Sequence, residues 1–286
     1  MHYPVMLAEC LEYLAVRPDG IYLDATAGLG GHTGAIAQRL TSGLVIANDR
    51  DAESLEMARQ NTAQWAERIR YHHGSFGNLR GALNEFGIER VDGLLADLGV
   101  SRYQLTDPQR GFSWMADTPV DMRMDRSQGE TAAEILNFTS EKDLAGLIYR
   151  AGEERRSRSI ARALVRARPI LSTGQLARVI ESAVPRTGKL HPATQTFMAL
   201  RRVVNNEEAE LDSLLSIAPD LVRSGGRIVF LSFMSLEDRK VKHAFQAWAR
   251  AGKANILTKH VVKPTPEETR SNPPSRSAVL RAAELK

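Results

Sequence analysis

The chain has 286 residues, of which 43% are hydrophobic, and it carries a formal net charge of +4. This composition predicts a globular protein that buries a sizeable core, and it permits a polyanionic partner without requiring one. No stretch approaches the roughly 18 apolar residues of a membrane span and the N-terminus has no signal pattern, so we expect a cytoplasmic protein. The single cysteine excludes an internal disulfide and a cysteine-based zinc site. No metal site is expected.

A glycine-rich loop, Asp24-Ala25-Thr26-Ala27-Gly28-Leu29-Gly30-Gly31-His32, follows an expected helix from Val5 to Leu14 and the apolar run Ile21 to Leu23. A helical pattern starts near Thr33, so the segment is typical of a strand, a glycine turn and a helix. Glycines accept positive φ and let a ligand approach, and the helix offers its first N–H groups. The loop therefore predicts a nucleotide-type cofactor, although a turn without any ligand has the same pattern.

The spacing of the glycines distinguishes between cofactors. A dinucleotide fingerprint needs glycine at its first, third and sixth positions, and here Gly28 and Gly30 fit but the sixth position is Thr33. An acid four residues ahead of a Gly-x-Gly-Gly cluster, as Asp24 is, is typical of methyltransferases that use S-adenosylmethionine (AdoMet), whose ammonium suits a nearby anion. The loop thus favours AdoMet and disfavours a nicotinamide cofactor.

A second strand is expected from Gly43 to Asp49, and it ends in an acid that lies 18 positions beyond Gly31. An acid at about this distance can accept both ribose hydroxyls of a bound nucleoside. Asp49 could instead cap the following helix, Ala52 to Arg59, but Asp51 competes for that position. We therefore expect Asp49 to contact the cofactor.

Two further strands are expected, Arg68 to His73 and Asp92 to Gly99, each followed by a candidate site residue. Phe76 could flank an adenine ring, although a single Phe is more often part of a core, and Asp97 interrupts the apolar run of the fourth strand. Strands that alternate with helices predict a doubly wound parallel sheet that binds ligands at the carboxyl ends of its strands. That edge would be shared by Asp24, Asp49, Phe76 and Asp97.

The alternation stops between about Tyr103 and Gln195, where helical patterns alone follow an irregular stretch. These patterns cover Thr131 to Asn137, Ser140 to Arg150, Glu153 to Arg168 and Thr173 to Ala183. In the third of them, one face carries a basic stripe formed by Arg155, Arg158, Arg162 and Arg166. The stripe suits nucleic acid or is simply a solvated face, since Glu153 and Glu154 dilute its charge.

The alternation resumes after this helical segment. We expect a long helix from about Ala193 to Leu221, a strand from Arg227 to Phe233, and a helix from Ser235, with capping-box spacing, to near Gly252. Two strand-like runs follow, Asn255 to Val262 and Ser277 to Ala282, and a proline-rich charged connection joins them.

Together these residues resemble the bacterial 16S rRNA (cytosine-N4)-methyltransferase family (RsmH/MraW). The similar stretches are His2-x-Pro4-Val5, Asp24 to Thr33, Asp92 to Ser101 with Gln104, Arg110 to Ser113, Asp121 to Met124, Gly152 to Arg155, His191 to Thr194, Phe197-x-Ala199-Leu200-Arg201, Asn205, Ser235 to Arg239, and Asn272-Pro273 with Arg276-Ser277. The sequence departs from the family pattern at Met234, at Arg102-Tyr103 and at Pro274-Ser275, all near the expected substrate side.

The resemblance implies a Rossmann-like AdoMet-dependent methyltransferase sheet with an all-helical domain inserted after strand four. We expect residues 1–104 and 196–286 to form the AdoMet-binding domain and residues 105–195 the helical rRNA-binding domain. The implied activity is N4-methylation of one cytidine of 16S rRNA in the small ribosomal subunit, with the oligomeric state, monomer or homodimer, left open.

The implied site residues divide into three groups. The cofactor contacts are Gly30, Gly31, His32, Asp49, Phe76, Asp97 and Gln104, of which His32 and Gln104 rest on the resemblance alone. From its place at the tip of the fourth strand, Asp97, or a carbonyl of Leu98 to Val100, is also the catalytic candidate that would hold the hydrogens of the cytosine amine while the enzyme aligns that amine with the methyl and sulfur atoms. The candidate RNA contacts are Arg110, Arg123, Arg155, Arg201 and Arg276.

Other functions are compatible with the sequence. A methyltransferase of the same architecture could act on another RNA or on a protein, and a non-catalytic RNA-binding assembly factor could keep the fold. A nicotinamide-dependent reductase is disfavoured by the glycine spacing.

Overall fold

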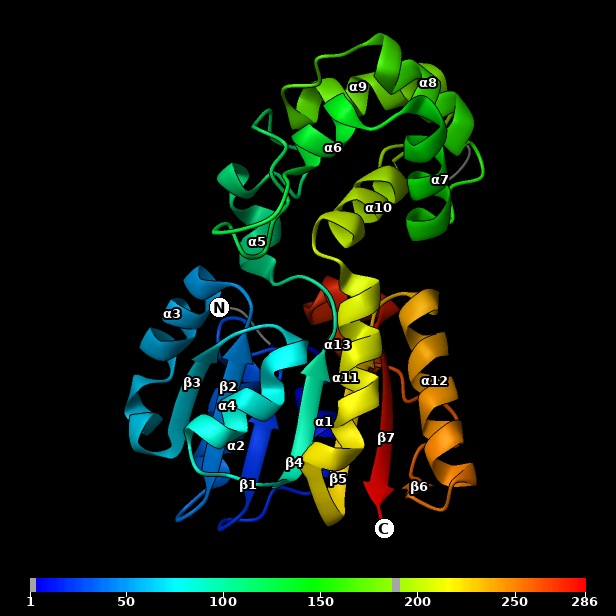
Figure 1. Cartoon of the computed structure of the whole chain (residues 1–286). Helices are drawn as coiled ribbons and strands as arrows, with labels where there is room; N and C mark the ends of the chain where they lie inside the picture. Colours follow the sequence, from blue (N-terminus) through cyan, green and yellow to red (C-terminus); the bar gives the residue numbers. More distant parts are fainter. Residues whose placement is uncertain (1–3, 187–190) are drawn as a thin grey trace. The chain divides into compact units, whose positions relative to one another are not determined.

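The computed structural model describes residues 4–186 and 191–286, and the chain forms two compact units. The first unit combines the chain up to Gly99 with Ala209–Lys286, and the second is Val100–Glu208. Both units are drawn in Figure 1. Among the described residues, none of the helices combines the length and apolar character needed to cross a bilayer.

The first unit contains a seven-stranded sheet in the order β3-β2-β1-β4-β5-β7-β6. Its strands are β1 (Ile21–Asp24), β2 (Leu44–Asp49), β3 (Ile69–His73), β4 (Val91–Asp97), β5 (Val222–Ser232), β6 (Ala254–Ile256) and β7 (Val279–Leu285). Strands β1 to β5 are parallel, whereas β7 runs antiparallel to both of its neighbours. The predicted Rossmann-like fold with a doubly wound sheet is thereby confirmed.

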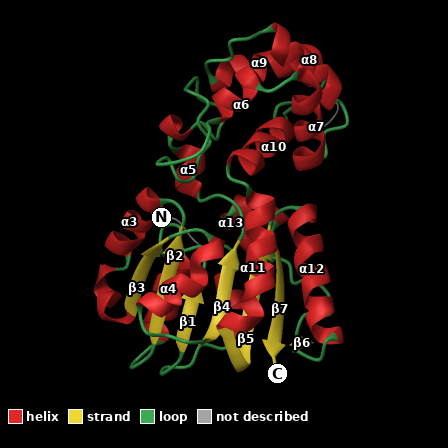
Figure 2. Ribbon diagram, in the orientation of Figure 1, coloured by secondary structure: helices red, strands yellow, loops and turns green. Residues whose placement is uncertain are grey.

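Helices cover both faces of this sheet (Figure 2). Apolar side chains of α4 (Leu79–Glu85), α11 (Glu207–Leu221) and α12 (Ser235–Arg250) belong to one core cluster. Those of α1 (Leu7–Leu14), α2 (Gly31–Arg39) and α3 (Ala52–Asn61) belong to another, which also contains the buried Cys10. The near-continuous apolar strands are therefore covered on both sides, as a parallel sheet requires.

Strand order also fixes where a ligand can bind. The chain crosses from β1 outward to β2 and β3 and then returns to place β4 on the other side of β1, so the order reverses between β1 and β4. Asp24 ends β1 and Asp97 ends β4, and both acids lie at the carboxyl edge. A reversal of this kind leaves a crevice beyond the strand ends, which is where doubly wound sheets bind ligands.

The second unit is built on α5 (Arg102–Thr106), α6 (Ala132–Phe138), α7 (Glu141–Gly152), α8 (Ser157–Arg166), α9 (Thr173–Ala183) and α10 (Thr194–Val204). Its own apolar core includes Leu144, Ile160 and Leu176, which come from three different helices. Several predicted helices of this region, including those that became α6, α7 and α9, are therefore confirmed.

Two helix boundaries were predicted wrongly. The expected long helix from Ala193 to Leu221 is two helices, α10 and α11, because Asn206 has a φ of 49° and ends the first of them. Asn205 stabilises the break, since its side chain accepts from the N–H of Met124 and donates to the carbonyl of Met122. Arg155 precedes α8 and is not part of it, because Glu153 at φ 53° separates α7 from α8.

The C-terminal part differs from the sequence predictions in two details. Met234, and not Ser235, is the N-cap of α12. The strand expected from Asn255 to Val262 is limited to β6, and the connection before β7 contains a short helix, α13 (Pro266–Ser271), that was not predicted. Proline at the first position of α13 and the cap Thr265 explain that helix, because both are typical helix-start residues.

Candidate functional site

The glycine loop between β1 and α2 adopts a conformation that requires glycine at Gly30. This residue has a φ of 85°, and a Cβ there would lie 2.8 Å from Thr62 Cγ2 and 3.2 Å from the backbone of Ala58. At Gly31 an added Cβ would press on the ring of Pro4, at 3.1 Å. The loop is thus packed against α3 and the N-terminal segment, and it begins α2 with no side chain over the helix start.

Asp24 holds the loop from below. It is fully buried, and its two carboxylate oxygens accept hydrogen bonds from the hydroxyl of Thr33, at 2.6 Å, and from the N–H of Thr26, at 3.1 Å. Burial raises the pKa of Asp24 to about 6, while these hydrogen bonds oppose the shift. Because Asp24 is fully buried, it shapes the loop from within the protein instead of presenting an exposed anion to a ligand.

Asp49 ends β2 and faces the same loop. Its carboxylate accepts hydrogen bonds from the backbone N–H groups of Gly28 and Asp51, each at 2.8 Å. Asp51 caps α3 by accepting from the N–H groups of Glu53 and Ser54, so the predicted capping role of Asp51 is confirmed. Burial raises the pKa of Asp49 to about 6, and each of its oxygens retains a lone pair for a further donor.

Asp97 is the least satisfied of the three acids. Its backbone N–H donates to the hydroxyl of Thr26 at 2.6 Å, but its Oδ1 is buried and has no hydrogen-bond partner among the described residues. Its Oδ2 lies 3.8 Å from Nδ1 of His32, too far for a hydrogen bond, and 26% of the side chain is exposed. Burial, followed by the charges of Asp24 and Glu237, raises the pKa of Asp97 to about 8.

His32 occupies the first turn of α2 and is almost fully buried. Its Nε2 lies 3.0 Å from the carbonyl oxygen of Val5, so the ring ties the helix start to the N-terminal segment. The carboxylate of Glu268 on α13 accepts from the N–H of Met6 in the same segment, at 2.6 Å. His32 therefore lies between a backbone anchor and Asp97, and its contact with the cofactor stays a prediction.

Two site residues have partners that the sequence analysis missed. Phe76 is half-buried, and its backbone N–H donates to the carboxylate of Glu210 on α11, at 2.9 Å. Glu237 is buried after β5 and accepts from the N–H groups of Phe233 and Met234. The third position of a helix is where an acid typically accepts from the N-cap backbone, so the contacts of Glu237 could have been predicted from the sequence. The contact of Glu210 with Phe76 could not, because the two residues lie 134 positions apart.

The geometry fits a cationic nucleoside cofactor. Three acids at strand ends lie beside a loop that requires glycine at Gly30, and an oxygen of Asp97 is buried without a partner among the described residues. Like charges at short range are unfavourable unless a proton or another cation compensates them. The positive charge of AdoMet would provide that compensation, and its ribose would find acceptors at Asp49.

The remaining predicted residues belong mostly to the second unit. Gln104 is buried and forms a capping box at the start of α5, where its side chain accepts from the N–H of Ser101. Its expected contact with the cofactor stays a prediction. Arg110 is 1% exposed and donates to the carbonyls of Arg123 and Met124, so it supports a loop in the core instead of presenting a surface charge to RNA.

The other four arginines differ in how much of their charge is available. Arg123 forms a two-point ion pair with Asp121, at 2.7 and 3.1 Å, and Arg201 forms one with Glu207, at 2.7 and 2.8 Å. Arg155 and Arg276 are exposed, in the second and the first unit respectively. A sequence cannot distinguish these cases, because the acids that neutralise an arginine are chosen by local folding.

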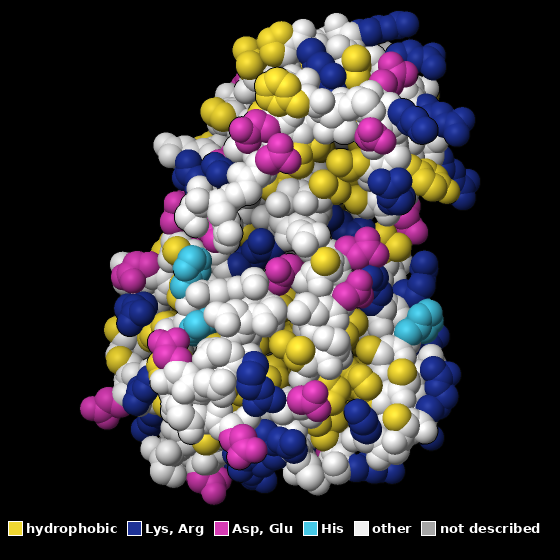
Figure 3. Space-filling view, in the orientation of Figure 1, with side chains coloured by type: hydrophobic (Ala, Val, Ile, Leu, Met, Phe, Trp, Pro, Cys, Tyr) yellow, Lys and Arg dark blue, Asp and Glu magenta, His cyan; other side chains and the backbone are white. Residues whose placement is uncertain are grey.

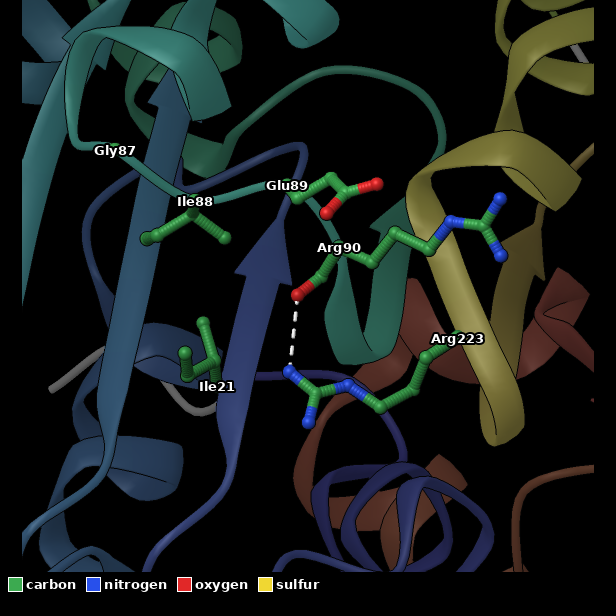
Figure 4. Close-up of a pocket in the computed structure, with 6 residues that line it drawn as sticks. All are labelled: Ile21, Gly87, Ile88, Glu89, Arg90 and Arg223. Atoms are coloured by element: carbon green, nitrogen blue, oxygen red, sulfur yellow. Dashed lines mark hydrogen bonds between the residues drawn. The ribbon is translucent and has the colours of Figure 1, made fainter.

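A surface hollow of about 430 Å³ lies at the opposite, amino-terminal ends of the central strands (Figure 4). Its lining includes Ile21 and Ile88, and Figure 4 shows the side chains of Glu89 and Arg90 directed away from these two residues. Arg223 donates to the carbonyl of Arg90 and pairs with Asp92, which also pairs with Arg17. Among the described residues no group of three or more His, Cys, Asp or Glu could hold a metal ion.

Known proteins resemble this chain over its whole length. A family model described as the MraW methylase family matches residues 1–286. A protein of Solibacter usitatus named ribosomal RNA small subunit methyltransferase H is 64% identical over 100% of both chains. One of the same name from Acidobacterium capsulatum is 48% identical over 100% of this chain and 98% of its own length. A solved rRNA methylase structure from Streptococcus thermophilus aligns over 98% of this chain and 91% of its own, but its TM-score of 0.44 at 12% identity is too low to support an inference.

Proposed function

The chain belongs to the MraW methylase family, and from this premise we propose that it transfers a methyl group from AdoMet to N4 of one cytidine in the 16S rRNA of the small ribosomal subunit. The relatives, which bear the name ribosomal RNA small subunit methyltransferase H, support an AdoMet-dependent rRNA methyltransferase. The observation that carries the chemistry is the buried oxygen of Asp97 at the end of β4, which has no hydrogen-bond partner within residues 4–186 and 191–286. A substrate of this kind locates the reaction in the cytoplasm.

The chain's own residues suit AdoMet as cofactor. Gly30 and Gly31 would allow the close approach of its methionine part, and Asp49 would accept the ribose hydroxyls. Phe76, fixed by Glu210, would flank the adenine, and His32 and Gln104 would complete the contacts that the family implies. When bound, AdoMet supplies a methyl group activated by a positively charged sulfur.

Asp97 would act on the amine that receives the methyl group. The N4 lone pair of cytosine is delocalised into the ring, and an acceptor that holds the amine hydrogens favours a nucleophilic geometry at nitrogen. Near a cationic cofactor the pKa of Asp97 falls from about 8, so the carboxylate form that can accept these hydrogens becomes the main one at neutral pH. Its role is primarily to position the amine in line with the methyl group, which needs no covalent intermediate; the proton that N4 loses once it is methylated would pass to Asp97 or to water.

The test is to incubate the protein with AdoMet and small ribosomal subunits that lack the modification, and then to identify methylated nucleosides by mass spectrometry. We expect N4-methylcytidine at one position of 16S rRNA, and its loss in Asp97→Asn. Asp19→Asn is the matched control, because Asp19 is exposed and lies before β1, at the other edge of the sheet. Methylation of a different base would refute the proposed target, and RNA binding without any methylation would indicate an assembly factor.

A further inference from the structure

The second unit contains a run of positive charge that the proposed reaction does not use. Between Arg155 and Ile180 the sequence has seven arginines and no aspartate or glutamate. Lysine is absent from this run as well, so its charge is carried by guanidinium groups alone. In Figure 3, Lys and Arg side chains gather along the edge of the second unit where Figure 1 places α7 and α8.

Two of these arginines have structural roles. Arg156 donates to the carbonyl of Pro185 at 2.8 Å and pairs with Glu154, and Arg168 donates to the carbonyl of Leu136 at 2.8 Å. Both side chains are half-buried, and each stabilises a chain segment outside α8. The guanidinium groups of these two arginines are therefore used in contacts within the second unit.

The arginines of α8 are different. Ile160, Ala161 and Leu164 are buried, while Arg158, Arg162 and Arg166 are exposed on the solvent side. They are spaced four residues apart, so they follow one another along one face at intervals of about 6 Å. Within the described residues neither Arg158 nor Arg166 has an ion-pair or hydrogen-bond partner.

The acid nearest to this arginine row does not neutralise it. Arg162 has its Nε 3.5 Å from an oxygen of Glu141, and both side chains are about half exposed or more. Exposed ion pairs of this kind contribute little, so Glu141 can be displaced by a stronger anion. Arginines four apart on a helix repel one another by a few tenths of a kcal/mol, and the row therefore does not stabilise the isolated protein.

We infer that Arg158, Arg162 and Arg166 of α8 form a docking surface for RNA phosphates on the second unit. The inference rests on the proposed function, since it assigns part of the rRNA contact to the second unit. A planar guanidinium matches phosphate oxygens better than an ammonium does. A protein partner would need an apolar or aromatic anchor, and the solvent face of α8 offers only arginines and Ser159 between them. Recognition by charge alone suits a polyanion.

The test compares binding to a 16S rRNA transcript over a range of salt concentrations. Three phosphate contacts correspond to about 2 to 3 units of slope in a plot of log affinity against log salt, and to about 100-fold in affinity at 0.1 M salt. The triple variant Arg158→Gln, Arg162→Gln, Arg166→Gln should lose slope and affinity by these amounts. The triple Lys variant should retain most of the slope, because it keeps the charge.

The matched control removes the same charge elsewhere. Arg39, Arg70 and Arg250 are exposed on the first unit, and their triple Gln variant should keep the slope within about one unit. Equal losses in both triple variants would mean that only the net charge matters, and an unchanged slope in the α8 variant would also overturn the inference. AdoMet affinity should be unchanged in all variants. If the wild-type chain binds the transcript but methylates no subunit, the proposed function fails while this slope comparison remains valid.

Discussion

Replacing Asp97 with asparagine should stabilise the cofactor-free first unit at neutral pH and abolish methyl transfer. The carboxyl has a pKa of about 8 in the folded chain, against an ordinary value of 3.8, because the site buries it near Asp24 and Glu237. Its buried Oδ1 has no partner among the described residues that would favour the charged form. In the free protein the carboxyl is therefore mainly protonated at neutral pH, and a nearby cation would favour its ionised form.

Because folding raises the pKa of Asp97, the contribution of this carboxyl to stability depends on pH. A carboxyl whose pKa is raised by folding contributes stability that is fully present below pH 4 and is lost as the pH rises to about 8. Each pKa unit corresponds to about 1.4 kcal/mol, so four units set an upper limit of about 6 kcal/mol, and partial exposure of the side chain reduces it to a few. Between pH 5.5 and 7.5 the stability of Asp97→Asn relative to wild type should rise by about 2 to 3 kcal/mol.

Urea unfolding at the two pH values measures this change. Of the three tryptophans, Trp114 lies in the second unit, so a Trp114→Phe background leaves fluorescence from Trp65 and Trp248 to report the first unit. Asp24→Asn is the contrasting variant. Its oxygens accept two hydrogen bonds, and it should lose stability at pH 5.5. A stability difference for Asp97→Asn that does not change with pH would refute the reasoning.

Three further predictions concern cofactor binding, which titration calorimetry measures, and the stability changes that go with two of them are measured by urea unfolding. AdoMet affinity should rise between pH 6 and 8, by at most tenfold per pH unit, because binding releases the proton of Asp97. An affinity that does not change with pH, with no proton released on binding, would contradict this prediction. Gly30→Ala should weaken AdoMet binding at least tenfold and destabilise the chain by about 2 kcal/mol or more. The control is Gly87→Ala, since Gly87 has a φ of 69° but no atom lies within 4 Å of the new Cβ. This control should lower the stability by only about 1 kcal/mol and leave AdoMet binding unchanged. Asp49→Asn should weaken AdoMet binding about 10- to 100-fold with little loss of stability, and equal affinity would exclude the ribose contact.

The sheet could be predicted from the sequence because its signals are local. Apolar runs that end in an acid or a glycine located β1, β2 and β4 to within a few residues. Their alternation with helices predicted that these strands run parallel. The break at Asn206 could not be predicted in this way, because the apolar pattern of α10 continues into α11 and the side chain of Asn205 acts on a distant loop. Long-range hydrogen bonds decide such boundaries.

The candidate site shows the same division. The sequence indicated Asp49 and Asp97 from their places at strand ends. It could not show that the buried carboxylate of Asp24 accepts hydrogen bonds from Thr26 and Thr33. It also could not reveal that Arg110 is enclosed by the core of the second unit. Arginine is ambiguous in sequence, since the same side chain can donate to buried carbonyls or remain on the surface.

The three acids at the sheet edge differ in what satisfies them, and this difference assigns their roles. Asp24 is held by hydroxyl and backbone donors, and Asp49 by two backbone N–H groups, so both remain in place without a ligand. Asp97 has a buried oxygen that no described residue serves, and its pKa is the highest of the three. Evolution usually retains such a group only where a ligand completes it, because an unsatisfied buried carboxyl destabilises the fold. The acid that contributes least to the stability of the free protein is therefore the one that we expect to contact the reacting amine.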